Sequence, residues 1–369
     1  MTLRIATFNA ENLMHRFDFS GWKNVQRRDR TLHMLDVKDE THFKTLEQAR
    51  VVAHTDDTLQ LTALAVADCR ADIICMQEVE NLDALEAFEY GYLFKMAGHG
   101  YRHKYLIEGN DTRGIDVCVM MREETATGEK IEFVSMKSHA KLTYQELGIH
   151  NKALAETGNE PNERIFRRDC LEIDVKIGGR LLTIYTVHFK SMGGSKKDVD
   201  GRERTMPVRE AEAKAVRMII EKRFGKDKAA NKRWIICGDM NDYRSRVIIT
   251  GDRFDGYEFK SDFETKSGFD PLIEKGFSHN LVERRDAMEQ WTLYHSRGPQ
   301  EQHLCQLDYI LASPALADKN PKAVPQIIRN GQPFRTPFPK GQEVERYPRT
   351  GWDRPKASDH CPVVVELKI

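Results

Sequence analysis

The chain has 369 residues, of which 40% are hydrophobic, so it can bury a full core in one large domain or two smaller ones. Lys and Arg together number 57, as do Asp and Glu, so the formal net charge at pH 7 is zero. This balance excludes the global basic field of a nucleic-acid coat protein, and any binding of a polyanion must therefore be local.

The seven cysteines indicate an intracellular protein. Their number is odd and no CxxC pair occurs, so we expect reduced residues of the core. The N-terminus enters a strand without a charged-then-apolar leader, and no apolar run approaches the roughly 18 residues of a membrane helix. We therefore expect a soluble cytoplasmic protein without membrane insertion, and the sequence predicts no oligomeric state.

Polar side chains follow the first two predicted strands. Residues 3–8 alternate as a strand that ends at Asn9, and the largely apolar residues 72–77 form a buried strand that ends at Glu78. An unpaired buried charge is costly, so the Glu78 carboxylate must be solvated, paired or bound to a metal. The alternatives are an ordinary turn residue at Asn9 and an ordinary strand-end residue at Glu78.

Helices and further strands surround these two strands. Residues 20–44 are charged without periodicity and predict a surface loop, whereas apolar residues recur at helical spacing over residues 46–69. A short helix is predicted over residues 81–88. Three more strands are expected at residues 104–107, 115–121 and 131–136.

The turn between the first two of these three strands, residues 110–116, carries Arg113. Its guanidinium suits a phosphate, although an ordinary hairpin turn explains the same residues. Residues 138–168 are polar, contain Gly, Asn and Pro, and predict an insertion in a long loop. The insertion ends in three arginines that could face a substrate, Arg164, Arg167 and Arg168.

A β-hairpin is predicted where strand patterns at residues 171–177 and 180–187 flank a Gly-Gly turn. Its second strand ends at His188, and Lys190 follows. A lone histidine at a strand end is more often structural than catalytic, so both interpretations stay open.

A loop with glycine and lysine residues is predicted over residues 193–205, most simply as a solvated connection. It leads into a helix over residues 203–224, which carries Arg209 near its start.

Residues 234–242 hold the most informative motif, in which an apolar run breaks at Gly238 onto Asp239 and Asn241. We expect the run to be a buried strand, and Gly238 to let the backbone turn as it leaves the sheet. In an extended chain Asp239 and Asn241 would point to one side. A carboxylate beside an amide can hold a cation, a water or a phosphate oxygen, although an Asx-rich turn is the alternative.

After this motif the pattern is weak until residues 291–294 and 307–311, which we predict to be two paired strands. Asp308 lies inside the second of them. Because aspartate is disfavoured in strands, its presence there indicates a use.

Residues 329–357 are rich in Pro, Gly and Arg and predict a loop. Aromatic residues are interleaved in it, namely Phe334, Phe338, Tyr347 and Trp352. Such a mixture can stack bases and hold phosphates, and a proline-rich packing loop is the alternative. Asp359 and His360 follow, directly before a terminal strand at residues 362–367.

No internal repeat, low-complexity segment or clean linker divides the chain, so we predict one domain over residues 1–369 with loop insertions near 138–168 and 329–357. Its strand ends present oxygen and imidazole groups, on Asn9, Glu78, His188, Asp239, Asn241, Asp308, Asp359 and His360. This set suits Mg²⁺ better than zinc, because Mg²⁺ takes oxygen ligands and keeps several waters. His–Asp pairs beside such an ion can move protons, so we expect metal-assisted attack of water on a phosphoester.

The motifs TFNAEN, ICMQEVEN, TVHFKS, ICGDMND, LDYIL and SDHCPV, in this order across residues 5–365, resemble the endonuclease/exonuclease/phosphatase superfamily. The resemblance implies an α/β (α+β) fold, a four-layer sandwich in which two packed, mostly antiparallel β-sheets are flanked by helices. It places the active site at one end of the sheets. His188 matches the general acid of the deoxyribonuclease-like branch, so the resemblance leans towards that branch.

The resemblance also implies roles for individual residues. Glu78 would be the principal Mg²⁺ ligand with Asn9 beside it, and Asp359 would help to hold the metal or its waters. Mn²⁺ or Ca²⁺ could replace Mg²⁺.

Among the catalytic residues, Asp239 would orient or deprotonate the attacking water, and Asn241 would bind a phosphate oxygen. His360 would contact the scissile phosphate and stabilise its developing charge, held by the hydrogen bond that it donates to Asp308. His188 would protonate the leaving oxygen.

Weaker candidates for substrate phosphate contacts are Arg113, Lys190 and Arg209. Three loops carry basic residues and two of them carry aromatic residues, at 138–168, 193–205 and 329–357. They favour a nuclease acting on nucleic acid or a nucleotide phosphodiester. The alternatives are a phosphatase or phosphodiesterase for a small phosphorylated metabolite or lipid headgroup, and a non-catalytic binding protein. No exposed aromatic hairpin of the membrane-dipping sphingomyelinase kind is expected.

Overall fold

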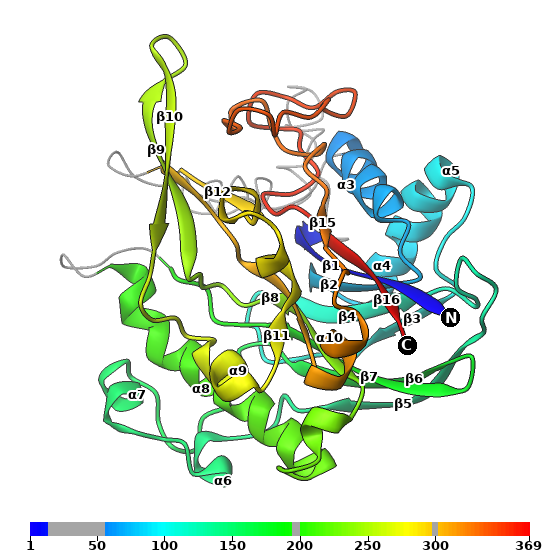
Figure 1. Cartoon of the computed structure of the whole chain (residues 1–369), viewed down its shortest axis with the longest axis vertical. Helices are drawn as coiled ribbons and strands as arrows, with labels where there is room; N and C mark the ends of the chain where they lie inside the picture. The colour runs from blue at the N-terminus through cyan, green and yellow to red at the C-terminus, as the bar shows by residue number, and fades with distance from the viewer. Residues whose placement is uncertain (14–55, 194–199, 297–301) are drawn as a thin grey trace, which may run out of the picture.

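The computed structural model describes residues 1–13, 56–193, 200–296 and 302–369. In this part of the chain the strands form two six-stranded sheets and one four-stranded sheet. Figure 1 shows α3 (Asp56–Cys69) and α4 (Leu82–Phe88) on one side of the strands and α8 (Gly201–Phe224) on the opposite side. The predicted four-layer α/β sandwich is confirmed.

The first sheet joins the two ends of the chain. Its strands, in spatial order, are β15 (Gln326–Ile327), β16 (Val363–Lys368), β1 (Thr2–Leu13), β2 (Ile73–Val79), β4 (Asp116–Met121) and β3 (His103–Leu106). Only β1 and β2 are parallel, because β1 pairs antiparallel with β16 and β2 pairs antiparallel with β4. The first and last strands of the chain therefore lie side by side in one sheet.

The second sheet contains the hairpin and the central motif. Its strands, in spatial order, are β11 (His279–Asn280), β14 (Asp308–Ala312), β8 (Trp234–Asp239), β7 (Arg180–His188), β6 (Cys170–Ile177) and β5 (Ile131–Ser138). The predicted β6–β7 hairpin is confirmed, and its turn residues Gly178 and Gly179 have φ of 51° and 82°, which glycine adopts freely.

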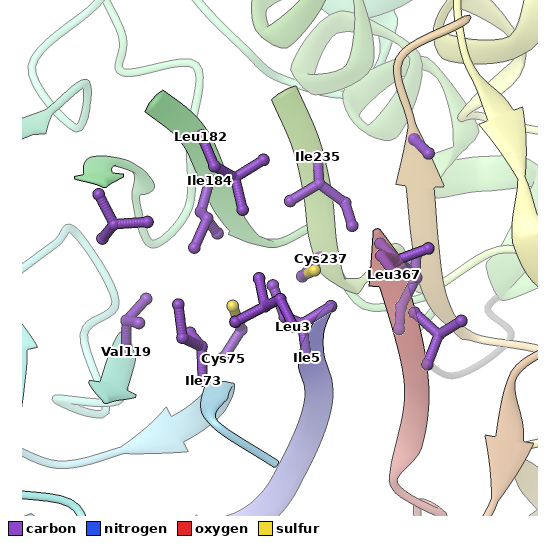
Figure 2. Close-up of a cluster of buried hydrophobic side chains, with 14 of the residues drawn as sticks. Leu3, Ile5, Ile73, Cys75, Val119, Leu182, Ile184, Ile235, Cys237 and Leu367 are labelled. Carbon is purple, nitrogen blue, oxygen red and sulfur yellow. The ribbon is translucent and has the colours of Figure 1, made fainter. Parts of the chain in front are cut away.

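The main core lies between these two sheets. Figure 2 shows side chains of β1, β2 and β4, such as Ile5 and Val119, facing side chains of β7 and β8, such as Ile184 and Ile235. The other faces of the strands pack under the helices, so that β2 and β8 are buried on both faces. This double burial explains why the central strands are continuous apolar runs.

The third, four-stranded sheet was not predicted. Its strands, in spatial order, are β10 (Gly256–Phe263), β9 (Ser245–Asp252), β13 (Gln302–Cys305) and β12 (Leu293–His295). The β9–β10 hairpin projects from the body of the molecule in Figure 1. One of its two faces is largely open, so its sequence lacks the apolar run that marked β2 and β8.

The prediction that residues 291–294 pair with 307–311 is wrong. β12 pairs with β13, whereas β14 pairs with β8 and β11 in the other sheet. The chain changes sheets between β13 and β14, where the Thr292 hydroxyl accepts hydrogen bonds from the backbone N–H groups of Leu307 and Asp308. Side-chain hydrogen bonds therefore join the two segments in place of a strand ladder.

The two predicted insertions differ. Residues 138–168 are more ordered than the predicted loop, because α6 (Tyr144–Leu147) and α7 (Lys152–Glu156) pack Tyr144 and Leu154 against the core under α8. Residues 329–357 contain no helix or strand, as predicted.

The remaining helical elements are short. They are the π-helix Glu89–Leu93, α5 (Phe94–Ala97), α9 (Asp270–Ile273), α10 (Pro314–Lys319) and the 3₁₀ turns Ala229–Asn231, Glu274–Gly276, Leu281–Arg284 and Ala287–Glu289. The predicted surface loop at 20–44 lies outside the described residues, as does the part of the predicted helix before residue 56. All seven cysteines are free and buried, as predicted. No helix in the described ranges is both long and apolar enough to cross a membrane.

Candidate active site

Strand ends from both large sheets converge at one edge of the sandwich. Because β7 and β8 are parallel and β14 is antiparallel to β8, His188, Asp239 and Asp308 lie on one rung of the second sheet. Asn9 and Glu78 come from β1 and β2 of the facing sheet. Here we call this set, together with Asn241 and His360, the strand-end cluster.

Backbone geometry at this edge is unusual. Glu78 has φ of 62° and Asn241 has φ of 49°, which side chains other than glycine rarely adopt. Residues other than glycine keep a positive φ only where the surrounding structure enforces it, and such positions often lie at functional sites. Gly238 does not make the predicted turn but stays within β8, where a Cβ would lie 1.9 Å from the Val187 carbonyl oxygen. The glycine therefore permits close strand approach, and the turn comes at Asn241.

Asp239 is the hub of the cluster. Its Oδ1 accepts a hydrogen bond from the Asn241 backbone N–H at 2.8 Å, and its Oδ2 accepts from the Asn9 and Asn241 amides at 3.0 Å each. Burial raises the pKa of Asp239 to about 7, and the Asp308 carboxylate adds to this shift while His360 opposes it. The residue is thus fixed in place and ready to accept a proton near neutral pH.

His360 and Asp308 form a buried pair. His360 Nδ1 lies 2.8 Å from Asp308 Oδ2, which leaves Nε2 facing the cluster, 3.8 Å from Asp239 Oδ2. Burial alone would lower the pKa of His360, but the carboxylates of Asp308 and Asp239 hold it well above its ordinary value. The two carboxylates therefore favour the charged form of His360. Asp308 Oδ1 is buried without a hydrogen-bond partner among the described residues.

His188 has the opposite electrostatics. Its Nε2 lies 3.4 Å from Asp239 Oδ2 and 3.9 Å from Glu78 Oε1. Burial, followed by the charge of nearby cations such as Arg168, lowers the pKa of His188 well below its ordinary value. Two histidines with opposite pKa shifts, one cationic and one neutral, are the arrangement expected of groups with different roles in one reaction.

Glu78 fits a hard divalent cation. Asn9 turns its amide nitrogen to Glu78 and Asp239, and its Oδ1 accepts the Glu11 backbone N–H at 3.0 Å, so its amide would have to rotate before it could bind an ion. Glu78 Oε1 lies 3.5 Å from Asn9 Nδ2, and burial raises the pKa of Glu78, with the Asp359 carboxylate adding to the shift. A bound cation would offset this accumulation of negative charge. No group of three or more His, Cys, Asp or Glu side chains forms a metal cage within the described ranges. A carboxylate with an amide still suits Mg²⁺, which keeps several waters and uses few protein ligands.

Glu11, which the sequence analysis did not single out, holds Asp359 beside the cluster. Its Oε2 accepts the Asp359 backbone N–H at 2.9 Å, and its carboxylate pairs with Arg354 at 2.6 Å and Lys356 at 3.1 Å. Its φ of 51° is a further strained position. No local sequence pattern indicated this role, because its partners lie more than 300 residues further along the chain.

Cations lie at the rim of the cluster. Arg113 is half exposed and pairs with Asp111 at 3.1 Å, and its charge reaches Glu78. Lys190 is partly buried, with Nζ 3.2 Å from the Ser191 hydroxyl. Burial lowers the pKa of Lys190, and the charge of Arg168 adds to the shift.

Arg168 is a cation beside the cluster that the sequence analysis noted among three arginines that could face a substrate, without assigning it to the site. It is buried, donates from Nη1 to the Phe189 carbonyl at 3.1 Å, and has Nε 2.8 Å from Asp111 Oδ2. The signal was available in the hairpin, since Cys170 pairs with Val187 and two further residues bring Arg168 beside Phe189.

Arg209 does not join the cluster. It is fully buried, with Nε 3.0 Å from Asp242 Oδ2, Nη1 2.6 Å from the Thr205 hydroxyl and Nη2 2.6 Å from the Arg202 carbonyl. A guanidinium bound on every side by the protein is not available to a substrate. The expectation of a phosphate contact at Arg209 is corrected to a structural role.

Comparisons with known proteins identify the family and the fold. The sequence matches the Endonuclease/Exonuclease/phosphatase family over residues 7–360. A search of curated proteins gave no match. An endonuclease/exonuclease/phosphatase family protein from Bacteroides thetaiotaomicron is 15% identical with a TM-score of 0.53, covering 100% of this chain and 95% of that chain. Truncated TDP2 from Caenorhabditis elegans is 10% identical with a TM-score of 0.50, covering 100% and 98%.

At these identities the structural likeness shows the fold alone. The two-sheet sandwich and the sequence match define a hydrolase that acts on phosphoester bonds. The chain belongs to the endonuclease/exonuclease/phosphatase family.

Proposed function

We propose that the chain is a divalent-metal-dependent phosphodiesterase that hydrolyses nucleic acid by attack of water. The observation that supports this most strongly is the shared rung of His188, Asp239 and Asp308, faced by Glu78 from the other sheet. A base, an acid and a metal-binding carboxylate are then within a few ångströms of one another, as hydrolysis of a phosphodiester requires.

Glu78 and Asn9 would hold Mg²⁺, and Asp359 would hold the ion or its waters. When bound, the ion would polarise a phosphoryl oxygen and neutralise charge that develops on it. The chemistry of the donor set accepts Mn²⁺ or Ca²⁺ as well, because both ions take oxygen ligands.

Asp239 would take a proton from the attacking water. Its three hydrogen bonds from Asn9 and Asn241 fix its orientation towards that water. Asn241 also donates to the Phe189 carbonyl at 3.1 Å, so binding a phosphate oxygen would require it to give up one of these bonds.

His360 would stabilise negative charge on the phosphate, because Asp308 keeps its imidazole oriented and charged. His188 would supply a proton to the leaving oxygen. Its contact with Asp239 Oδ2 at 3.4 Å provides a route by which the proton taken from water reaches it.

The rim favours a polyanionic substrate. Arg113 and Lys190 lie at the rim and would contact backbone phosphates, and the buried Arg168 adds its positive charge behind them. The net charge of zero makes this a local field rather than a global one. A small phosphorylated metabolite or lipid headgroup is the alternative substrate, since Asp111 already neutralises part of the charge of Arg113 and Arg168.

We further propose a single domain over residues 1–369 and a cytoplasmic location. The first is supported by the pairing of β1 with β16 and by a core that both sheets share. The second is supported by the seven free, buried cysteines.

The test is hydrolysis by wild-type and His360→Ala protein with Mg²⁺, on single- and double-stranded DNA, RNA, a bis-aryl phosphodiester, and sugar and inositol phosphates. We expect cleavage of the polymers that is lost in the variant and in chelator. Phosphate release from the small monoesters alone would favour the metabolite phosphatase. No turnover of any substrate by folded protein would contradict the enzyme assignment.

A further inference from the structure

The β9–β10 hairpin and residues 329–357 pack on one another through Trp291 and form one surface beside the strand-end cluster. Phe338 packs against Trp291 with ring centroids 5.3 Å apart, and the Arg329 guanidinium lies 4.1 Å from the Trp291 ring. The same apolar cluster includes Val247 and Ile249 of β9. Residues 329–357 are therefore fixed on the third sheet although they contain no helix or strand.

Four aromatic side chains on this surface are open to solvent, and two of them, Phe254 and Trp352, share one arginine; the other two are Phe263 and Phe334. Phe254, at the tip of the hairpin, is 80% exposed, and Trp352 is 56% exposed. The Arg253 guanidinium lies 4.6 Å from the Phe254 ring centroid and 5.6 Å from the Trp352 ring centroid. Segments far apart in sequence thus combine two exposed rings with a cation. The sequence analysis did not indicate that the β9–β10 hairpin carries an exposed aromatic residue at its tip.

The surface is continuous with the cluster. Two residues after Trp352, Arg354 pairs with Glu11 at 2.6 Å, and Lys356 pairs with the same carboxylate at 3.1 Å. Because two cations share one carboxylate, the three groups together keep a positive charge. Glu11 in turn holds the Asp359 backbone N–H at 2.9 Å, next to His360.

We propose that this surface binds the unpaired bases of a single-stranded nucleic acid whose backbone enters the strand-end cluster. The proposal rests on the proposed function and deepens it, because it names the substrate class. Exposed rings stack on bases of any sequence, and arginines beside them contact the phosphates between those bases. The bases of a duplex stack on one another and cannot use the rings.

The test compares Phe254→Ala and Trp352→Ala with Tyr90→Ala. Tyr90 is 74% exposed and belongs to a hollow with Phe94 and Arg122 at the other end of the first sheet, so it is a matched aromatic control. Binding of labelled single-stranded and duplex oligonucleotides is measured with each protein, together with steady-state hydrolysis of the single strand and of a bis-aryl phosphodiester. Cosedimentation with anionic phospholipid vesicles is measured in parallel.

We expect each of the two variants to weaken single-strand binding about 10-fold or more and to raise KM by a similar factor. Duplex binding, hydrolysis of the small diester and the melting temperature should stay at wild-type values, and Tyr90→Ala should match wild type throughout. Equal losses in Tyr90→Ala, unchanged single-strand binding, or a variant effect confined to vesicles would overturn the proposal. If the protein hydrolyses the small diester but binds single strands no better than duplexes, the binding surface proposed here is overturned and the proposed function stands. If it hydrolyses no substrate, the proposed function is overturned as well.

Discussion

Asp239 and Asp242 are three residues apart in the chain, and each is the centre of a buried cluster of charged side chains. The two clusters differ in how completely protein groups compensate these charges. Asp242 is fully buried, and its carboxylate accepts from Arg202 Nε at 2.6 Å, Arg209 Nε at 3.0 Å, and the backbone N–H groups of Tyr243 at 2.9 Å and Gly268 at 2.8 Å. Every acceptor position is used by a protein donor. This cluster joins α8 to the loop after β8 and leaves nothing for a ligand.

The strand-end cluster is compensated only in part. Asp239 and Asp308 face each other with His360 as the shared cation, and Asp308 Oδ1 lacks a partner within the described residues. Glu78 is partly buried, and loss of water contact raises the pKa of its carboxyl. Incomplete compensation is costly for folding, so it persists where a substrate or an ion completes it. The strand-end cluster therefore has the character of a functional site, whereas the Asp242 cluster, built from the same residue types, is structural.

The largest effect is expected from the histidine that faces both Asp239 and Glu78. Replacement His188→Gln should lower kcat about 10²- to 10⁴-fold by removing the proton donor. His139→Gln is the matched control, because His139 is also a buried histidine beside a carboxylate, with Nε2 2.9 Å from Glu172 Oε2. Steady-state kinetics should show wild-type kcat for the control. Equal losses in both variants would place His188 in the scaffold.

A smaller loss is expected when His360 loses its carboxylate partner. Asp308→Asn should lower kcat about 10- to 100-fold. The His360 imidazole stays in the site but loses the carboxylate that keeps it charged and oriented. In the double variant with His360→Ala the two losses should be less than additive, since both changes disrupt the same His360–Asp308 pair. Strictly additive losses in the double variant would show that the two residues act independently.

Binding of a metal ion at Glu78 should raise the free energy of unfolding of the protein. Mg²⁺ at about 100 times its dissociation constant should stabilise the wild-type protein by about 2.7 kcal/mol. Glu78→Gln should abolish this increment in thermal unfolding, whereas Glu108→Gln, at an exposed carboxylate, should retain it. A Mg²⁺-induced increase in the melting temperature of Glu78→Gln equal to that of wild type would exclude Glu78 as the principal ligand.

The smallest effect concerns pH and lies outside both clusters. Burial lowers the pKa of His139 to about 4, with Lys137 adding to the shift. In the unfolded chain histidine titrates near about 6.5, so the stability that neutral His139 contributes is complete above that pH and is lost as the pH falls towards 4. His139→Gln should reduce this loss by on the order of 1–3 kcal/mol in urea unfolding. If the free energy of unfolding of His139→Gln depends on pH as steeply as that of wild type, His139 does not cause this loss of stability.

The sequence predicts the strand-end cluster well because the information is local. Each buried strand is an apolar run, and the polar residue that ends it is visible directly, as at Glu78 and Asp239. Parallel pairing of β1 with β2 and of β7 with β8 then brings these ends to one edge. The roles assigned to these residues stay proposals.

What the sequence could not predict depends on distant partners. Arg209 reads as an exposed helix residue until Asp242, which lies 33 residues away, is placed against it. The β9–β10 strands lack a distinctive pattern because one face packs on residues 329–357 and the other is largely open. Likewise, Trp291 packs on Phe338 and not against a strand partner. Burial created by loops leaves no periodicity in the sequence.

The most direct test compares Asp239→Asn with Asp242→Asn, by measuring kcat and the free energy of unfolding of both. For Asp239→Asn the account predicts a kcat about 10³-fold lower with stability at or above wild type, because one of two facing carboxylates is removed. For Asp242→Asn it predicts a loss of about 3–5 kcal/mol, since two buried guanidinium groups lose their counterion, with kcat of the folded protein within about 10-fold of wild type. The reverse pattern, with activity lost only at Asp242 and stability lost only at Asp239, would contradict the account.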